Sequence, residues 1–430
     1  MKVVRVVLIS PPSPFRDKPD PSGMPLGLVV LGSWILGARA DVAIIDGYSK
    51  AQGVDEVVAE ALGLNPDIVG ISIPFTFLER TALKIAGEIK KHDPKILIVA
   101  GGFQASRNYE KILREGNFDF VILNDGEEPF RGLVSLVLQG RLNVVYEKSI
   151  AGIASFKDGK ILFEKPEQID HLGLIRPDYD LLPDFEYESI RIETSRGCGF
   201  NCPYCATTGY WGRKHRPIDP ATVLTVLAEQ CYKGKNKFSV ADDNFNFNKQ
   251  HARRICEQIT RLDIDPQIGV SCRPELLTRE DLEIYRRAGI NSIFLGLESG
   301  SPEILKQLKR AHDLDMTREM IEFAMSIGID IHTSFMIGLP GETRDDIKKT
   351  LEYADSLPTS NIGFHIFHPL PGSEFGDNME KYGMTIENPE FEGLGAIGSV
   401  APIRTGNLSS MEISDFYDRA IEMIRRKKGR

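Results

Sequence analysis

Residues 190–205 read IRIETSRGCGFNCPYC, so that three cysteines directly follow an apolar run typical of a strand. Thiolates this close repel one another unless a metal neutralises them, and iron-sulfur cubes are bound by thiolates on such loops. Only three ligands are local, whereas a structural zinc site requires four. The spacing favours a [4Fe-4S] cluster held by Cys198, Cys202 and Cys205, with one iron left open for a substrate.

The other cysteines, Cys231, Cys256 and Cys272, form no close pair and have no histidine at zinc spacing. We interpret them as small buried hydrophobes. Six cysteines are too few for a disulfide framework, and none precedes Cys198. The thiol-free first part and the rest of the chain are therefore expected to differ in chemistry.

The first part alternates apolar runs with helix-like stretches, the pattern of a parallel sheet covered by helices. The expected strands are residues 3–10, 42–46, 68–73, 96–100 and 120–124, and the expected helices are residues 26–36, 54–62, 77–91 and 109–115. These elements predict an α/β, doubly wound, Rossmann-like domain, in which ligands bind at the carboxyl ends of the strands.

A second series of alternating strands and helices begins at residue 190. Its expected strands are residues 190–194, 237–241, 268–272, 292–297, 331–337 and 362–369. Six such units predict a partial (β/α)6 barrel with its chemistry at the carboxyl ends of the strands. The predicted domains are residues 1–140, a linker with a small hairpin at 141–189, the barrel at 190–375 and a C-terminal extension at 376–430. Within the extension, the glycine-rich residues 391–398 and an amphipathic helix at 410–427 are expected to close the barrel mouth.

Composition and charge exclude several classes of protein. The chain has 430 residues, 42% hydrophobic and 26% charged, unlike disordered, collagenous or disulfide-scaffold proteins. A formal net charge of −9 gives no basic field for nucleic acid. The longest uncharged stretch, residues 21–38, contains prolines and glycines and favours a buried helix over a membrane span. With no signal-peptide cleavage site in view, we expect a cytoplasmic protein without a membrane span or a nucleic-acid partner.

The CxxxCxxC spacing after the first barrel strand resembles the radical SAM superfamily, whose members bind S-adenosylmethionine (SAM) at a [4Fe-4S] cluster. Four further segments resemble that family in the same order: residues 241–245 (ADDNF), 271–274 (SCRP), 296–300 (GLESG) and 338–342 (GLPGE). The resemblance covers residues 190–370. It implies SAM contacts from Tyr204, Asp242, Asp243, Arg273 and Glu298.

The chemistry of these side chains also suggests roles independently of the resemblance. Asp242 and Asp243 are suited to accept hydrogen bonds from the methionyl ammonium group, or to cap the next helix. Arg273 is suited to a carboxylate or phosphate, with a surface ion pair as the alternative. Glu298 follows an apolar strand, where a carboxylate needs a partner such as a ribose hydroxyl or an arginine.

Because a radical SAM-like segment follows it, the first domain resembles the cobalamin-binding domain that precedes the radical SAM core in the B12-dependent branch of the family. The resemblance rests on residues 11–12 (PP), 25–28 (PLGL), 70–72 (GIS), 101–102 (GG) and 125–128 (DGEE). It implies that loops at the carboxyl ends of the strands contact cobalamin. The residues implied are Pro12, Tyr48, Ser72, Phe75, Thr76, Gly101, Gly102, Gln104, Gly126 and Glu127.

Cobalamin domains that bind cobalt through a histidine carry DxHxxG after a strand, but residues 46–51 read DGYSKA here. Tyr48 stands in the histidine position. Phe103 and Gln104 follow the double glycine, where the family often has a histidine. We therefore predict cobalamin bound without histidine ligation, its lower face covered by residues 73–77 or by Tyr48.

The combined resemblance implies a cobalamin-dependent radical SAM methyltransferase. In that family the open iron binds the amino and carboxylate groups of SAM, and one electron from the reduced cluster releases a 5′-deoxyadenosyl radical. This radical takes hydrogen from an unactivated carbon, and methylcobalamin then donates its methyl group. A second SAM remethylates the cobalamin. A one-electron donor such as ferredoxin or flavodoxin is implied as a partner.

The substrate, a small molecule or a polypeptide, is not specified by the sequence. The resemblance extends to enzymes that C-methylate a glutamine of methyl-coenzyme M reductase and to relatives that methylate phosphinate phosphorus. A second interpretation is an enzyme that uses both cofactors but forms or oxidises a ring without methyl transfer. A third, a non-catalytic cobalamin or redox sensor, requires an added signalling domain, for which residues 376–430 are too few.

Overall fold

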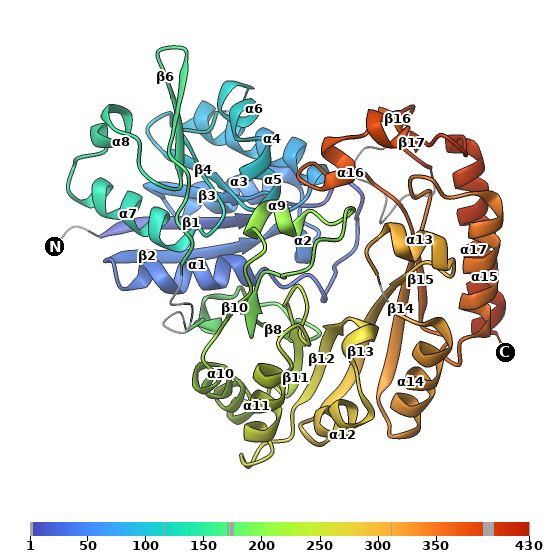
Figure 1. The fold of residues 1–430 in the computed structure, drawn as a ribbon. Helices are drawn as coiled ribbons and strands as arrows, with labels where there is room; N and C mark the ends of the chain where they lie inside the picture. Colours follow the sequence, from blue (N-terminus) through green and yellow to red (C-terminus); the bar gives the residue numbers. More distant parts are fainter. Residues whose placement is uncertain are drawn as a thin grey trace. The chain divides into compact units, whose positions relative to one another are not determined.

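Two sheets, one in each half of the chain, organise the molecule (Figure 1). The computed structural model describes residues 3–115, 117–169, 172, 176–310, 312–389 and 400–429. The chain divides into two compact units, Met1–Ile190 and Arg191–Arg430. Each unit has its own sheet and its own hydrophobic core.

The sheet of the first unit has the strand order β2-β1-β3-β4-β5-β6-β7. Its parallel strands are β1 (Val4–Ser10), β2 (Ala40–Asp46), β3 (Ile68–Ser72), β4 (Leu97–Gly101) and β5 (Phe120–Ile122). The strand β1 has β2 on one side and β3 on the other, so successive strands are added first on one side of β1 and then on the other. This is the doubly wound arrangement that the alternating pattern predicts, and ligands bind beside such a switch point.

Helices cover both faces of this sheet (Figure 1). They are α1 (Leu26–Leu36), α2 (Gly47–Lys50), α3 (Val54–Gly63), α4 (Thr76–His92), α5 (Phe103–Arg107), α6 (Tyr109–Glu115), α7 (Glu127–Leu138) and α8 (Asn143–Glu147). Helix α1 packs against α7, and α3 packs against α4. The strands between them bury nearly every side chain, as strands covered on both faces must.

The segment expected to be a linker contributes a hairpin to this sheet. Strands β6 (Ile153–Lys157) and β7 (Lys160–Phe163) continue the sheet beyond β5 in antiparallel orientation. The hairpin joins the sheet because Ile153 and Ala154, alongside β5, are 2% and 0% exposed. Residues 141–163 are therefore part of the first unit in this structure, rather than a free connection.

The second unit is built on six parallel strands in the order β15-β14-β13-β12-β11-β8. Their bounds are β8 (Ile190–Ile192), β11 (Lys237–Val240), β12 (Gln267–Cys272), β13 (Ile290–Glu298), β14 (Asp330–Ile337) and β15 (Ile362–Ile366). The helices between and after them are α9 (Thr207–Trp211), α10 (Pro220–Tyr232), α11 (Lys249–Ile259), α12 (Arg279–Arg287), α13 (Pro302–Gln307), α14 (Leu314–Ser326), α15 (Arg344–Ser356), α16 (Glu374–Asp377) and α17 (Ser410–Lys428). The predicted six-stranded partial barrel is confirmed.

Local sequence explains where several of these helices begin. Helices α12 and α15 start at capping boxes, in which Thr278 pairs with Asp281 and Thr343 with Asp346. At the other end, the Lys427 ammonium of α17 donates to the carbonyl oxygens that end α15, including Leu357 O at 2.6 Å. Because α17 also packs on β15, it covers the last strand of the sheet.

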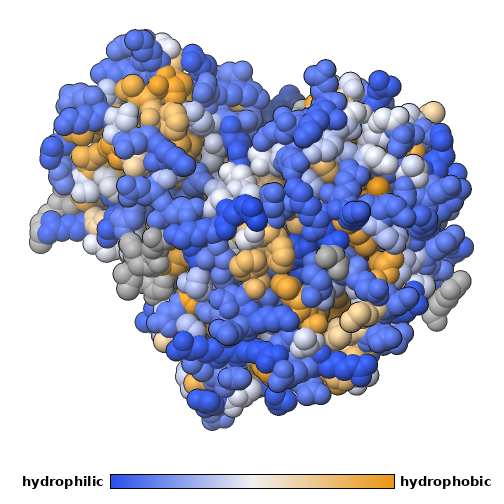
Figure 2. Space-filling view, in the orientation of Figure 1, coloured by the Kyte–Doolittle hydropathy of each residue, from blue (hydrophilic) through white to orange (hydrophobic). Residues whose placement is uncertain are grey.

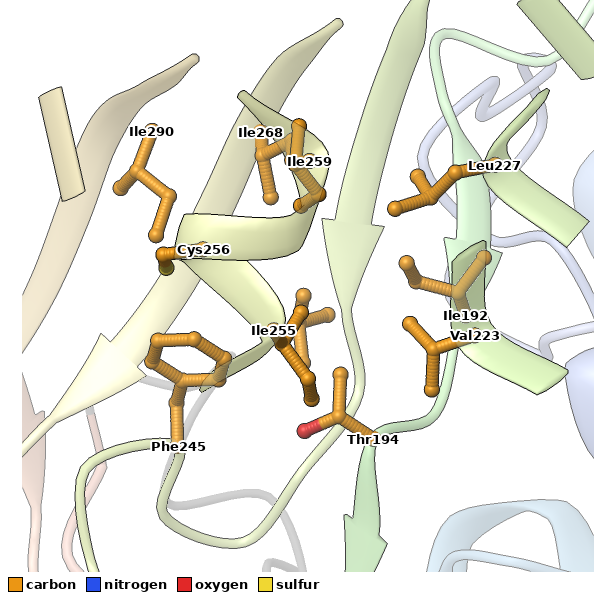
Figure 3. Close-up of a pocket in the computed structure, with 11 residues that line it drawn as sticks. Ile192, Thr194, Val223, Leu227, Phe245, Ile255, Cys256, Ile259, Ile268 and Ile290 are labelled. Carbon is orange, nitrogen blue, oxygen red and sulfur yellow. The ribbon is translucent and has the colours of Figure 1, made fainter. Parts of the chain in front are cut away.

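A small apolar pocket lies between the sheet and helices α10 and α11 (Figure 3). It is lined by Ile192, Thr194, Val223, Leu227, Val240, Phe245, Ile255, Cys256, Ile259, Ile268 and Ile290. The helix side chains point toward those of the strands, and no charged residue lines the pocket. It belongs to the packing of helices on the sheet, and Cys256 acts there as a small buried hydrophobe.

The C-terminal extension adds a short antiparallel pair, β16 (Thr385–Ile386) and β17 (Ile403–Arg404). The glycine-rich residues 391–398, expected to close the barrel mouth, lie outside the described residues.

Figure 2 shows a mainly hydrophilic face with an orange patch over the region of β6 and α8. Among the described residues, no helix combines the length and the apolar content needed to span a bilayer.

Candidate active site

The three clustered cysteines lie on one loop at the carboxyl end of the first barrel strand. The loop starts from the strand β9 (Ser195–Arg196), which pairs with β10 (Arg216–Pro217). Cys202 is buried, Cys198 and Cys205 are partly exposed, and all three are free thiols. The described residues contain no group of three acidic, histidine or cysteine side chains that would hold a single metal ion. A [4Fe-4S] cluster does not need such a group, because each of its thiolate ligands binds a different iron.

Two glycines give this loop its path. Gly197 has a φ of +82°, and a Cβ atom there would lie 2.2 Å from Lys214 O. A Cβ atom on Gly199 would lie 2.4 Å from the ring of Phe247. Since a larger residue would displace backbone or an aromatic ring, the glycines between and before the cysteines are required by the fold.

Arg273 is brought directly to the cysteine loop. Its Nη1 lies 3.2 Å from Cys202 Sγ, and its guanidinium sits 3.7 Å from the centre of the Phe200 ring. Glu275 accepts from Arg273 Nε over 2.8 Å, and Asn246 accepts from the Arg273 backbone over 2.9 Å. Arg273 is only 6% exposed, so its ion pair with Glu275 lies in the interior and not at the surface as the alternative from the sequence held.

Tyr204 and Glu298 are also brought together. The Tyr204 hydroxyl donates to Glu298 Oε1 over 2.9 Å. Glu298 is 9% exposed and has a φ of +67°, a conformation that non-glycine residues rarely adopt. Burial raises the pKa of Glu298. Strained backbone at a buried carboxylate is a common mark of a functional position.

Asp242 makes a different set of contacts from those expected. Its Oδ1 accepts from the backbone nitrogens of Thr194 and Ser195 at 2.7 and 3.0 Å, and its Oδ2 accepts from both hydroxyls. Burial raises the pKa of Asp242 to about 6. Both oxygens are thus engaged within the protein. Helix α11 is capped by Asn248, so the helix-capping reading of this pair is wrong.

Asp243 is exposed and contacts both ends of the cysteine loop. Its Oδ2 accepts from Gly197 N at 2.8 Å, and its Oδ1 accepts from the Thr207 hydroxyl at 3.0 Å. Gly197 immediately precedes the first cysteine, and Thr207 follows the last by two positions. The carboxylate therefore bridges the two ends of the loop.

The sequence analysis missed two buried polar residues near Arg273. Arg310 is 7% exposed, donates to the Gly296 carbonyl and lies 3.7 Å from Glu275 Oε2. His312 is 8% exposed, and neither ring nitrogen has a partner among the described residues. Burial lowers the pKa of His312 to about 4. No spacing rule marks these positions, which lie between helices α13 and α14 rather than at a strand end.

In the first unit, the implied cobalamin residues gather at the carboxyl edge of the sheet. They follow β1 (Pro12), β2 (Tyr48), β3 (Ser72, Phe75, Thr76), β4 (Gly101, Gly102, Gln104) and β5 (Gly126, Glu127). Gly102 has a φ of +100°, and a Cβ atom there would lie 3.0 Å from Ile73 O. The backbone therefore passes close to the loop after β3 at this point.

Gln104 does not face outward as the resemblance implies. Its Nε2 donates to Glu79 at 2.9 Å, and its Oε1 accepts from Thr76 at 3.2 Å. Asn108 and Lys111 also donate to Glu79. These hydrogen bonds outweigh burial and lower the pKa of Glu79. Because the Gln104 amide is 4% exposed and engaged on both atoms, we assign it a structural role.

Exposed aromatic side chains lie at the same edge. Phe75 is 53% exposed and stacks on Phe77 with ring centres 5.4 Å apart. Phe15, 55% exposed, packs edge-on against Phe77. Tyr48 is half-buried, with the Arg16 guanidinium 5.1 Å from its ring. Such rings offer an apolar surface suited to a large flat ligand.

Histidine is scarce in this unit. Residues 1–190 contain His92 and His171. His92 ends α4, which begins at the ligand edge and runs back across the sheet, so it lies at the opposite edge. His171 lies outside the described residues.

Two family models match the chain in the order of its two units. The B12 binding domain matches residues 15–134, and the Radical SAM superfamily matches residues 192–354. The chain is a B12-dependent radical SAM protein. The contacts around the cysteine loop lie within the second match, and the clustered loops of the first unit lie mostly within the first.

Several known proteins resemble this B12-dependent radical SAM protein over most of its length. An uncharacterized methyltransferase of Pyrococcus horikoshii is 29% identical over 388 residues, covering 87% of this chain and 82% of the relative. The anaerobic magnesium-protoporphyrin IX monomethyl ester cyclase of Rubrivivax gelatinosus is 26% identical over 407 residues, covering 91% and 71%. The methyltransferase TsrM of Kitasatospora setae, solved with cobalamin and a [4Fe-4S] cluster, superposes with a TM-score of 0.78 at 17% identity, covering 90% and 81%.

The residues present fit an iron-sulfur cluster. Burial raises the pKa of Cys198 and of Cys205, so the free thiols hold their protons more tightly than ordinary cysteines. A metal that binds the thiolates removes this penalty. Arg273 places a positive charge 3.2 Å from Cys202 Sγ, beside the position that the anionic cluster would take.

Proposed function

We propose that this protein is a cobalamin-dependent radical SAM methyltransferase that methylates an unactivated carbon. The observation that carries the proposal is the loop of Cys198, Cys202 and Cys205 with Arg273 Nη1 3.2 Å from Cys202 Sγ, in a chain that also has a B12-binding domain. When bound, the cluster and SAM supply radical hydrogen abstraction, and cobalamin supplies a transferable methyl group.

The side chains around the cysteine loop have separate tasks in this proposal. The three cysteines hold the cluster. Arg273 lies where its guanidinium can bind the carboxylate of SAM, and Glu275 keeps the guanidinium in place by accepting from its Nε at 2.8 Å. Glu298, fixed by the Tyr204 hydroxyl, offers an acceptor to a ribose hydroxyl.

In the first unit, the loops at the carboxyl edge would hold cobalamin. Phe75 and Phe77 offer stacked aromatic surface, and Gly101 and Gly102 let backbone approach the ligand. We propose that cobalt has no histidine ligand, because His92, the described histidine of this unit, lies at the opposite edge.

A ring-forming activity without methyl transfer is the second candidate. It is favoured by the 26% identity to the protoporphyrin ester cyclase, which spans 91% of this chain. The two candidates need the same cofactors and differ in the fate of the methyl group. We propose a one-electron donor such as ferredoxin or flavodoxin for either activity.

Anaerobic reconstitution with iron, sulfide and hydroxocobalamin, followed by reduction with methyl-labelled SAM, separates the candidates. A methyltransferase forms 5′-deoxyadenosine together with S-adenosylhomocysteine, and the label passes through methylcobalamin. A ring-forming enzyme forms 5′-deoxyadenosine while cobalamin stays unlabelled. Failure to take up cobalamin would overturn both. Small molecules and glutamine-containing peptides, such as the segment of methyl-coenzyme M reductase, form the substrate panel.

A further inference from the structure

Two consecutive aspartates after β11 hold the segment that carries the cysteines. Asp242 is 6% exposed and binds Thr194 and Ser195, where the chain leaves β8 and enters the cysteine loop. Asp243 binds the next fixed points along the chain, Gly197 and Thr207. The cysteines lie entirely between these last two points.

We propose that Asp243 is a positioning residue for the iron-sulfur cluster. One oxygen of its carboxylate fixes the backbone just before Cys198, and the other fixes the hydroxyl just after Cys205. A single side chain thereby sets the separation of the two loop ends. This inference rests on the proposed function, because it requires that the loop bind a cluster.

The geometry supplies the contacts that this positioning role needs. Each oxygen of Asp243 already accepts one hydrogen bond, at 2.8 and 3.0 Å, from the loop itself. Because a carboxylate oxygen can accept a second hydrogen bond, direct contact with SAM is the alternative that the test must separate from this role. Hydrogen-bonding partners just outside a metal's ligands orient those ligands and tune the site.

Variants of both partners test the proposal. Asp243→Ala removes both bonds, whereas Asp243→Asn keeps one acceptor oxygen. Thr207→Val removes the bond to Asp243 and the side-chain hydrogen bond to Cys205 without changing the shape of the side chain, and Thr207→Ser restores both. Asp281→Asn is the matched control, since Asp281 also joins two segments, Thr278 and Arg253, on outer helices. Circular dichroism and thermal unfolding show whether each variant folds.

The measurements are made without SAM: iron retained against a chelator after reconstitution, the EPR spectrum of the reduced cluster and its midpoint potential. We expect Asp243→Ala to retain iron about 10–100-fold less tightly. Asp243→Asn and Thr207→Val should show a smaller loss with a shifted potential. Thr207→Ser and Asp281→Asn should match the parent protein.

Two outcomes overturn different claims. If the folded Asp243 variants retain iron and show the parent EPR spectrum but bind SAM weakly, Asp243 is a SAM ligand and the positioning role is wrong. If the parent protein itself forms no cluster, the proposed function fails, and the aspartates hold a loop with another purpose.

Discussion

The Tyr204 hydroxyl donates a hydrogen bond to Glu298 Oε1 over 2.9 Å and so joins the cysteine loop to the end of β13. Tyr204 immediately precedes the last cysteine, whereas Glu298 is the last residue of a central barrel strand. Because Glu298 is buried, this hydroxyl is one of the few groups that compensate its charge. The loop and the strand end are therefore coupled before any ligand binds.

Loss of this bond should weaken SAM binding. Tyr204→Phe removes the hydroxyl and leaves a buried carboxylate with one donor fewer, so we expect about tenfold weaker binding of SAM to the reconstituted protein. Tyr382→Phe is the control, because Tyr382 donates a similar bond to Glu374 Oε1 at 2.5 Å in a more exposed place. Equal SAM affinities for the parent and Tyr204→Phe would contradict a role of this bond in the site.

Arg273→Lys should weaken SAM binding even though it retains the positive charge. A lysine cannot contact Cys202, stack on Phe200 and pair with Glu275 at once, as the planar guanidinium does. We expect SAM affinity to fall by about tenfold or more while the fold persists. Arg253→Lys alters an arginine paired with Asp281 and should leave SAM binding unchanged. Calorimetric titration measures both, and parent-like affinity of Arg273→Lys would refute the assignment.

Glu342 should make the stability of the second unit depend on pH. Burial raises the pKa of this fully buried carboxyl from 4.5 to about 8, although Gly338 N and Leu339 N donate to its Oε2. Between these pH values the folded chain keeps a proton that the unfolded chain releases. The contribution of Glu342 to the free energy of unfolding therefore falls as pH rises from 4.5 to about 8.

Glu342→Gln tests this sign, since a neutral amide oxygen can accept the same two bonds. At pH 8 the variant should be more stable than the parent by roughly 1 kcal/mol or more, and the gain should shrink toward pH 5. Glu412→Gln is the opposite case, because hydrogen bonds from Ser409 lower the pKa of Glu412 to about 2. It should lose stability at both pH values. Thermal unfolding that shows no pH dependence of the Glu342→Gln gain would count against the buried, protonated carboxyl.

Phe75→Ala should weaken cobalamin binding. The ring is 53% exposed at the carboxyl edge of the sheet and stacks on Phe77. We expect about 3–10-fold weaker retention of hydroxocobalamin. Phe163→Ala removes a comparably exposed ring, 47%, from the edge strand β7 and should have no effect. Absorbance after gel filtration gives the bound fraction, and equal losses in both variants would argue against a cobalamin site at this edge.

Local sequence predicts most of the fold. Residues 26–36 form the expected helix with the same bounds, and the strands of both sheets appear within a few residues of their expected positions. Apolar periodicity and turn residues carry this information. The hairpin of β6 and β7 was expected, but its pairing with β5 was not, because strand pairing depends on contacts between segments distant in sequence.

The site is less predictable from sequence. The cysteines and Arg273 follow from family spacing, whereas the partners of Asp242 and the positive φ of Glu298 arise only when strand ends meet in space. Arg310 reaches the site from the segment after α13, with no spacing rule to mark it. Gln104 shows the converse case, since its position in the sequence suggests a ligand contact, whereas its amide binds Glu79 and Thr76 in the structure.

The most direct test of the account is the EPR spectrum of the anaerobically reconstituted, cobalamin-loaded protein, reduced and recorded with and without SAM. The account predicts a [4Fe-4S] signal that SAM perturbs, and loss of that signal in the Cys198→Ala, Cys202→Ala and Cys205→Ala variants. It also predicts a cob(II)alamin spectrum without nitrogen splitting from a histidine. A cluster signal that survives loss of the three cysteines, or that SAM leaves unchanged, would contradict it.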